Sequence, residues 1–132
     1  MASHLSIDEV ARRTGLTAHT LRYYERIGLI APVGRADSGQ RRYAAADLAW
    51  IEFLLRLRTT RMPISQMQAF ATLRAAGDTT VPDRLAMLEV HLQQVLEQME
   101  AMRLSVQALE HKIGYYRAVR FNNSATCCSD GK

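Results

Sequence analysis

Residues 17–30 read TAHTLRYYERIGLI, and this stretch decides the fold of the first half of the chain. Thr17 is suited to cap a helix that runs to about Ile27, because its hydroxyl can accept a bond from an amide in the first turn. Helical spacing places four side chains on one face of that helix: His19, Arg22, Tyr23 and Arg26. Leu21 and Tyr24 point elsewhere, so this helix has a packing face and a separate basic, aromatic face.

The preceding residues predict a partner helix. Ser6 to Glu9 has the pattern of a capping box, and Gly15 is placed to end the helix that the box begins. Two short helices joined by a tight turn with glycine form the helix-turn-helix pattern. The basic face of the second helix would then fit a DNA major groove, where arginine binds bases or phosphates. The alternative is that these side chains only solvate the surface.

A basic hairpin follows. Residues 30–33 and 40–43 are predicted to be its strands, and Pro32 restricts the first of them to a sheet edge. Three arginines lie on this hairpin: Arg35, Arg41 and Arg42. A basic hairpin after a helix-turn-helix indicates a winged helix whose wing contacts the DNA backbone, with a merely solvated hairpin as the alternative.

The charge distribution agrees with a DNA-binding head. The net charge of the 132 residues is +4, and residues 1–62 hold ten arginines against six acidic residues. The other half is balanced, and arginine suits bidentate contacts to phosphates and guanines. No apolar run approaches the ~20 residues that a membrane helix needs, and no signal-peptide pattern is present. We therefore expect a cytoplasmic protein with no membrane partner, and no catalytic constellation indicates an enzyme.

A third helix is predicted over about residues 45–59, and a fourth from a second capping box, Ser65 with Gln68, to about residue 75. A much longer helix is then predicted over about residues 80–117. Its apolar residues keep a heptad spacing, and they are Leu85, Leu88, Leu92, Val95, Met99, Met102, Val106, Leu109, Ile113 and Tyr116. Such a stripe predicts a coiled coil, and the chain offers no second helix of that length. We therefore expect a homodimer, and we expect His91 and His111 to be solvated.

The sequence resembles the MerR family of bacterial transcriptional regulators over about residues 5–118. The motifs that carry the resemblance are SIDEVARRTGLTAHTLRYYERIGLI at 6–30 and SGQRRY at 38–43. The stretches WIEFLLRLRTTRMPI, TVPDRLAMLEVH and ALEHKIGYY look most like the branch that responds to aldehydes or other electrophiles. The resemblance implies a mainly all-α fold, with a winged helix-turn-helix head at residues 1–76 and an antiparallel coiled-coil dimerisation helix at 77–120. Residues 121–132 are small and polar and are predicted to form a flexible tail.

The resemblance also implies a function. Family members bind, as dimers, double-stranded promoter DNA at a pseudo-palindromic operator, and they distort an over-long promoter spacer for RNA polymerase in response to an effector. The alternative is an architectural or excision-type DNA-bending protein without an effector, against which the long coiled coil argues. The predicted DNA-binding residues are Arg12, Arg13, Thr17, His19, Thr20, Arg22, Tyr23, Arg26, Arg35, Arg41, Arg42 and Tyr43.

The effector stays open. Metal-sensing relatives carry a cysteine at the start of the dimerisation helix and electrophile-sensing relatives carry one in the third helix, but the matching residues 79–83 and 53–56 hold no thiol. The cysteines here are Cys127 and Cys128. Adjacent thiolates can hold a soft metal or metalloid ion, can be oxidised, or can have no role. In the last case, the effector would enter a cysteine-free pocket near Trp50, Phe53 and the start of the long helix.

Overall fold

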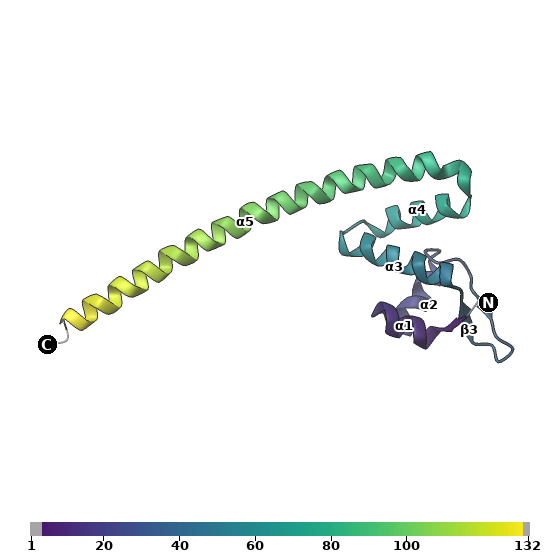
Figure 1. Cartoon of the computed structure of the whole chain (residues 1–132), viewed down its shortest axis with the longest axis horizontal. Coiled ribbons are helices and arrows are strands. Elements are labelled where there is room, and N and C mark those ends of the chain that lie inside the picture. The colour runs from purple at the N-terminus through teal and green to yellow at the C-terminus, as the bar shows by residue number, and fades with distance from the viewer. Residues whose placement is uncertain (1–3, 131–132) are drawn as a thin grey trace. The chain divides into compact units, whose positions relative to one another are not determined.

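A computed structural model describes residues 4–130, with side chains through residue 123. The described part of the chain is mainly helical with one small sheet, as the sequence predicts (Figure 1). The chain divides into a compact unit that ends at His91 and a second unit that begins at Leu92. No described helix is long and apolar enough to cross a membrane.

The first two helices form the predicted helix-turn-helix. Helix α1 spans Ile7–Thr14 and helix α2 spans Ala18–Arg26. The side chain of Ser6 accepts the Glu9 amide at 3.2 Å, and that of Thr17 accepts the Thr20 amide at 3.0 Å. Gly15 ends α1 with a φ of 77°, a left-handed conformation that a side chain would disfavour. Both caps and the turn between the helices are therefore confirmed.

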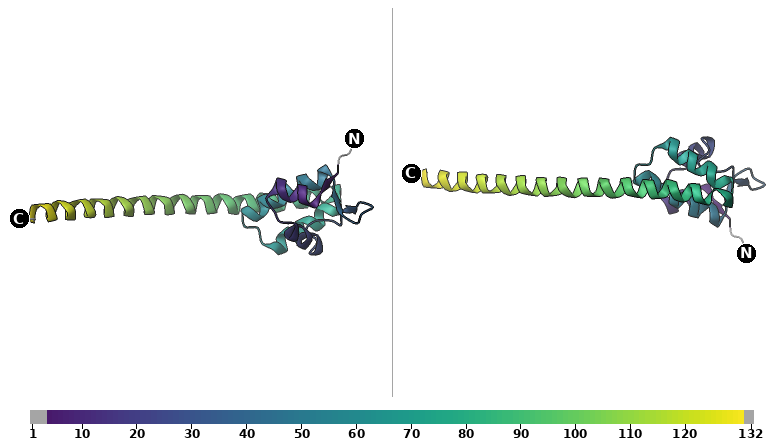
Figure 2. Two further views of the ribbon diagram at one scale, coloured as in Figure 1. Left: turned by 90° about the horizontal axis from the view of Figure 1, so that it is seen from below. Right: turned by 90° about the horizontal axis from the view of Figure 1, so that it is seen from above.

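The hairpin is part of a three-stranded antiparallel sheet in the order β1-β3-β2. Strand β1 spans Leu5–Ser6, β2 spans Gly34–Arg35 and β3 spans Arg41–Tyr43. The sequence did not predict β1, and the prediction of a strand at residues 30–33 is wrong. Leu29 and Ile30, at the start of this segment, are buried in the core and do not pair with another strand. The hairpin loop extends away from the helices (Figures 1 and 2).

Helices α3, Ala45–Thr59, and α4, Ile64–Ala75, complete the first unit. Helix α3 lies between the α1–α2 pair and α4 (Figure 1). Trp50 holds these layers together, because its indole Nε1 donates to the Leu29 carbonyl at 2.8 Å and its ring stacks on Phe70. Burying such a large aromatic ring with its N–H satisfied makes it a central core residue.

The predicted capping box of α4 is wrong. Helix α4 begins directly after Pro63, so Ser65 lies inside it rather than at its cap. The side-chain Nε2 of Gln68 instead donates to the carbonyl of Ile27 at 2.9 Å. This bond connects α4 to the end of α2. It is a tertiary contact that local sequence motifs do not predict.

Helix α5 spans Val81–Asp130 and follows a short 3-10 turn, η1, at Asp78–Thr80. Its 50 residues correspond to a length of about 75 Å. The helix extends past residue 120 into the segment that is predicted to be a flexible tail. The mobility of that tail and the predicted domain boundaries stay predictions.

His91 lies on α5 within the first unit, and the prediction that it is solvated is wrong. Its side chain is buried, and its Nε2 lies 2.7 Å from the hydroxyl oxygen of Thr60. Thr60 ends α3, so this hydrogen bond connects the start of α5 to the turn before α4. His111 is exposed, as predicted.

Most of the predicted heptad residues of α5 are exposed in the single chain. Eight of the ten are about half exposed or more, whereas Leu88 and Val95 are partly buried. An apolar stripe along a long helix is costly to leave in water. The second unit therefore presents a surface suited to pairing with another helix.

Candidate nucleic-acid interface

The basic, aromatic face that the sequence predicts for α2 is exposed. His19, Arg22, Tyr23 and Arg26 all reach solvent, and the guanidinium of Arg26 lies 5.5 Å from the centre of the Tyr23 ring. The opposite face is packed, because Leu21 is fully buried and Tyr24 is 6% exposed. The structure therefore assigns Tyr24 to packing, as predicted, and leaves the basic face of α2 free for a ligand.

Two predicted arginines of α1 lie beside Glu9. Arg12 and Arg13 both donate to its carboxylate, and these hydrogen bonds lower the pKa of Glu9 below its usual value. Both arginines remain exposed, and surface pairs of this kind contribute little to stability. A phosphate can therefore compete for them at small cost.

The wing arginines differ from one another. Arg41 forms an ion pair with Glu25 of α2, with 2.7 Å between its Nε and Oε1, and the two side chains are only 19% and 15% exposed. Arg35 and Arg42 are exposed, and Arg35 donates to the carbonyl of Gly39 in the hairpin loop. Arg41 thus connects the wing to α2, whereas the other two arginines face solvent.

We expect Glu25→Ala to weaken DNA binding about three- to tenfold, although it removes a negative charge from the basic surface. The reason is that the partly buried pair positions the wing against α2, and breaking it leaves Arg41 without its partner. Fluorescence anisotropy with a labelled operator duplex measures this. If charge alone mattered, the variant would bind more tightly than the wild type, which would contradict the positioning role.

Tyr43 is not part of the exposed surface, and its assignment as a DNA-binding residue is wrong. Its side chain is fully buried in the core, because it follows Arg42 on β3 and faces the helices. Burial raises the pKa of its hydroxyl above the ordinary value. Within the described part of the chain, this hydroxyl has no hydrogen-bond partner.

We expect Tyr43→Phe to leave the free energy of unfolding unchanged within about 1 kcal/mol or to raise it, because it removes a buried hydroxyl that no protein group satisfies. Tyr43→Ala, as the matched cavity-forming variant, should cost about 3–5 kcal/mol. Urea denaturation at one protein concentration compares them. A loss above 2 kcal/mol for Tyr43→Phe would mean that the hydroxyl makes a stabilising bond.

A groove lies between α1, α2 and the wing. It has a volume of about 290 Å³ and is lined by Ser6, Ile7, Asp8, Arg22, Arg35, Gly39, Gln40 and Arg41. The groove brings together Arg22 from α2 and Arg35 from β2. The sequence predicts these residues on separate elements and does not show that they are neighbours. The predicted residues Thr17 and Thr20 lie at the start of α2, where their hydroxyls are 2.9 Å apart, and their contact with DNA stays a prediction.

Sequence reasoning missed a second basic segment at the end of α3. Arg56, Arg58 and Arg61 are all exposed, and Nη1 of Arg58 lies 3.4 Å from the Tyr24 hydroxyl of α2. Arg61 has a φ of 67°, which is uncommon outside glycine. The signal available in the sequence was the density of arginine in RLRTTR, residues 56–61.

Comparison with known proteins identifies this arrangement. Residues 6–43, which hold the helix-turn-helix and the wing, match the family model described as MerR family regulatory protein. The chain belongs to the MerR family. It is 45% identical over 93 residues to the HTH-type transcriptional regulator AdhR of Bacillus subtilis (strain 168), a match that covers 70% of this chain and 66% of AdhR.

A MerR family structure extends the likeness to the whole chain. HiNmlR, a MerR family regulator lacking the sensor domain, was crystallised bound to promoter DNA. It matches with a TM-score of 0.81 and 28% identity over 98% of this chain and 97% of its own. The chain described here, like these relatives, is therefore a DNA-binding transcriptional regulator and not an enzyme.

The metal assignment has weaker support. A heavy metal-dependent transcription regulator of Rhizobium meliloti (strain 1021) is 26% identical over 111 residues, which cover 84% of this chain and 76% of that protein. Among the residues that the structure describes, no group of three or more His, Cys, Asp or Glu could hold a metal ion. The side chains of Cys127 and Cys128 lie outside the described residues.

Proposed function

We propose that the protein acts as a homodimer that binds a pseudo-palindromic operator in a promoter spacer. It activates or represses transcription by distorting that DNA in response to an effector. The observation that carries the DNA-binding step is the exposed basic face of α2, whose Arg22 lines one groove together with Arg35 of the wing. This groove offers side chains for both base edges and phosphates.

The heptad stripe of α5 supports the dimer. Its residues are exposed in the single chain at a spacing that fits an identical helix, and the family resemblance favours an antiparallel pair. Two heads on one dimer would contact two operator half-sites, so the symmetry of the operator would mirror that of the protein. Distortion of the DNA between the half-sites then changes how RNA polymerase contacts the promoter.

Operator binding can be tested with the promoter region upstream of the protein's own coding sequence. Fluorescence anisotropy would compare that duplex with a scrambled duplex of equal length and base composition at several salt concentrations. We expect the upstream duplex to bind at least about a thousandfold more tightly. Equal affinity for both duplexes would contradict a promoter-specific regulator and favour an architectural DNA-bending protein.

The effector can be separated from DNA binding. A reporter driven by the same promoter would be tested in cells that carry the wild type or the double variant Cys127→Ser/Cys128→Ser, exposed to metals, metalloids and aldehydes. A compound that induces only the wild type would assign sensing to the thiols of the tail. Equal induction of both would assign it to a cysteine-free pocket near Trp50 and Phe53.

A further inference from the structure

The groove between α1, α2 and the wing holds a carboxylate as well as arginines. Its lining includes Arg22 of α2, Arg35 and Arg41 of the wing, and Asp8 in the first turn of α1. Among the lining residues that the structure describes, Asp8 is the one acid. It is not among the predicted DNA-binding residues, and a negative charge in a groove that faces DNA needs an explanation.

The other polar side chains at the start of α1 have partners in the protein, but Asp8 has none. The hydroxyl of Ser6 accepts the Glu9 amide at 3.2 Å. The carboxylate of Glu9 accepts hydrogen bonds from Arg12 and Arg13. Asp8 is exposed, and within the described part of the chain its carboxylate makes no ion pair. Its charge is therefore directed at whatever occupies the groove.

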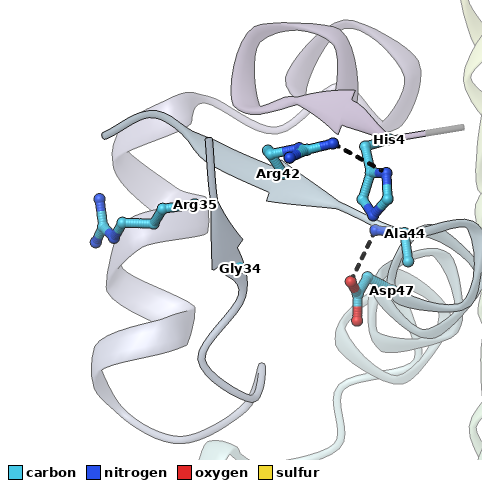
Figure 3. Close-up of a pocket in the computed structure, with 6 residues that line it drawn as sticks. All are labelled: His4, Gly34, Arg35, Arg42, Ala44 and Asp47. Atoms are coloured by element: carbon cyan, nitrogen blue, oxygen red, sulfur yellow. Dashed lines mark hydrogen bonds between the residues drawn. The ribbon is translucent and has the colours of Figure 1, made fainter. Parts of the chain in front are cut away.

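Two of the three arginines in the groove are not neutralised by the nearby carboxylates of α2 and α3. Glu25 pairs with Arg41, with 2.7 Å between Oε1 and Nε. One oxygen of Asp47 accepts a backbone amide at 2.9 Å, and Figure 3 shows the side chain of Arg35 extending away from Asp47. Arg22 and Arg35 are thus the free cations of the groove, and the carboxylate of Asp8 offsets one of these two charges.

The position of Asp8 indicates which part of the DNA its charge acts on. The first helix of a helix-turn-helix crosses the DNA backbone, while the second enters the major groove. Asp8 lies at the start of the first helix, so the DNA group that meets it is a phosphate, which a carboxylate repels. A groove that only had to attract phosphates would hold no such carboxylate.

Repulsion of this kind can provide specificity. Non-specific binding depends on phosphate contacts and allows the protein to dock in many registers, whereas base contacts fix one register on the operator. A repulsive group penalises the registers that bring a phosphate next to it. We propose that Asp8 is a specificity-determining residue, whose carboxylate weakens binding to non-operator DNA more than binding to the operator. This proposal rests on the proposed function.

The test compares the affinities of the full chain for the upstream duplex and the scrambled duplex at several salt concentrations. Asp8→Asn keeps the size of the side chain and removes its charge. We expect this variant to bind the scrambled duplex about three- to tenfold more tightly, and the upstream duplex within about twofold of the wild type. On the scrambled duplex alone, the slope of log K against log salt should become steeper by up to about 0.9, because one more phosphate is contacted. Asp8→Glu keeps the charge and should bind both duplexes like the wild type.

Glu110→Gln is the matched control, because it makes the same change of charge at an exposed position of α5 and should leave the preference for the upstream duplex unchanged. Circular dichroism and thermal unfolding monitor the fold of each variant. Equal tightening on both duplexes would overturn the proposal, since Asp8 would then only lower affinity.

Three other results would also overturn it. Unchanged affinity on both duplexes would remove Asp8 from the interface. Weaker binding to both, with lower thermal stability, would assign the carboxylate to the first turn of α1, where a negative charge favours the helix. Weaker binding to the upstream duplex alone would make Asp8 an acceptor for a base. Each of these leaves the proposed function intact, whereas failure of the wild type to prefer the upstream duplex would overturn both.

Discussion

We expect Val106→Asp to dissociate the proposed homodimer, with at least about a hundredfold rise in its dissociation constant. Val106 belongs to the heptad stripe of α5, and in the single chain its side chain is 46% exposed. An aspartate at this half-exposed position changes the free energy of unfolding of the monomer little. In the coiled coil, however, both copies of the carboxylate would be buried without a partner, and each burial costs several kcal/mol.

The matched control is Leu104→Asp, two residues earlier on the same helix. Leu104 is 52% exposed, about as much as Val106, but it lies outside the stripe. We expect this variant to remain dimeric, because its carboxylate would face water in the pair as well. Sedimentation velocity with circular dichroism measures mass and helicity for both. A dimer that persists in Val106→Asp, or one that is lost equally in both variants, would contradict the heptad interface.

Local chemistry explains which parts of the fold the sequence predicted well. Helix ends are set by interactions within a few residues. The caps at Ser6 and Thr17 and the glycine between α1 and α2 therefore form with little dependence on the rest of the chain. The same holds for the face of α2, where the helical period alone separates Leu21 and Tyr24 from Arg22. The long helix α5 could likewise be predicted, because its heptad spacing repeats along the sequence.

Three of the wrong predictions concern residues whose surroundings come from distant parts of the chain. His91 was expected in water, yet it meets Thr60, which lies 31 residues earlier in the chain. Gln68 was expected to cap its own helix, yet it bonds to Ile27. Tyr43 was grouped with the exposed arginines of its motif, although its position on the sheet turns it into the core. Propensity and spacing carry no information about such pairings, which depend on how the layers pack.

We expect Arg22→Ala to weaken operator binding more than tenfold without lowering the thermal stability of the protein. Arg22 is exposed, and within the described part of the chain it makes no ion pair or hydrogen bond that the fold would lose. Fluorescence anisotropy on operator and scrambled duplexes, together with thermal unfolding, measures both effects. Arg103→Ala is the control, because it removes an equally charged, exposed side chain from α5.

The pattern of the loss assigns the role of Arg22. Arg22 lies on the face of α2 but also lines the groove shared with Arg35, so its guanidinium can reach either a base edge or the backbone. A base contact would weaken the operator more than the scrambled duplex, since a bidentate arginine–guanine pair discriminates by about 1–3 kcal/mol. A phosphate contact would weaken both duplexes equally and lower the salt slope by about 0.9. Unchanged affinity on both duplexes would remove Arg22 from the interface and, with it, the assignment of this face of α2 to DNA.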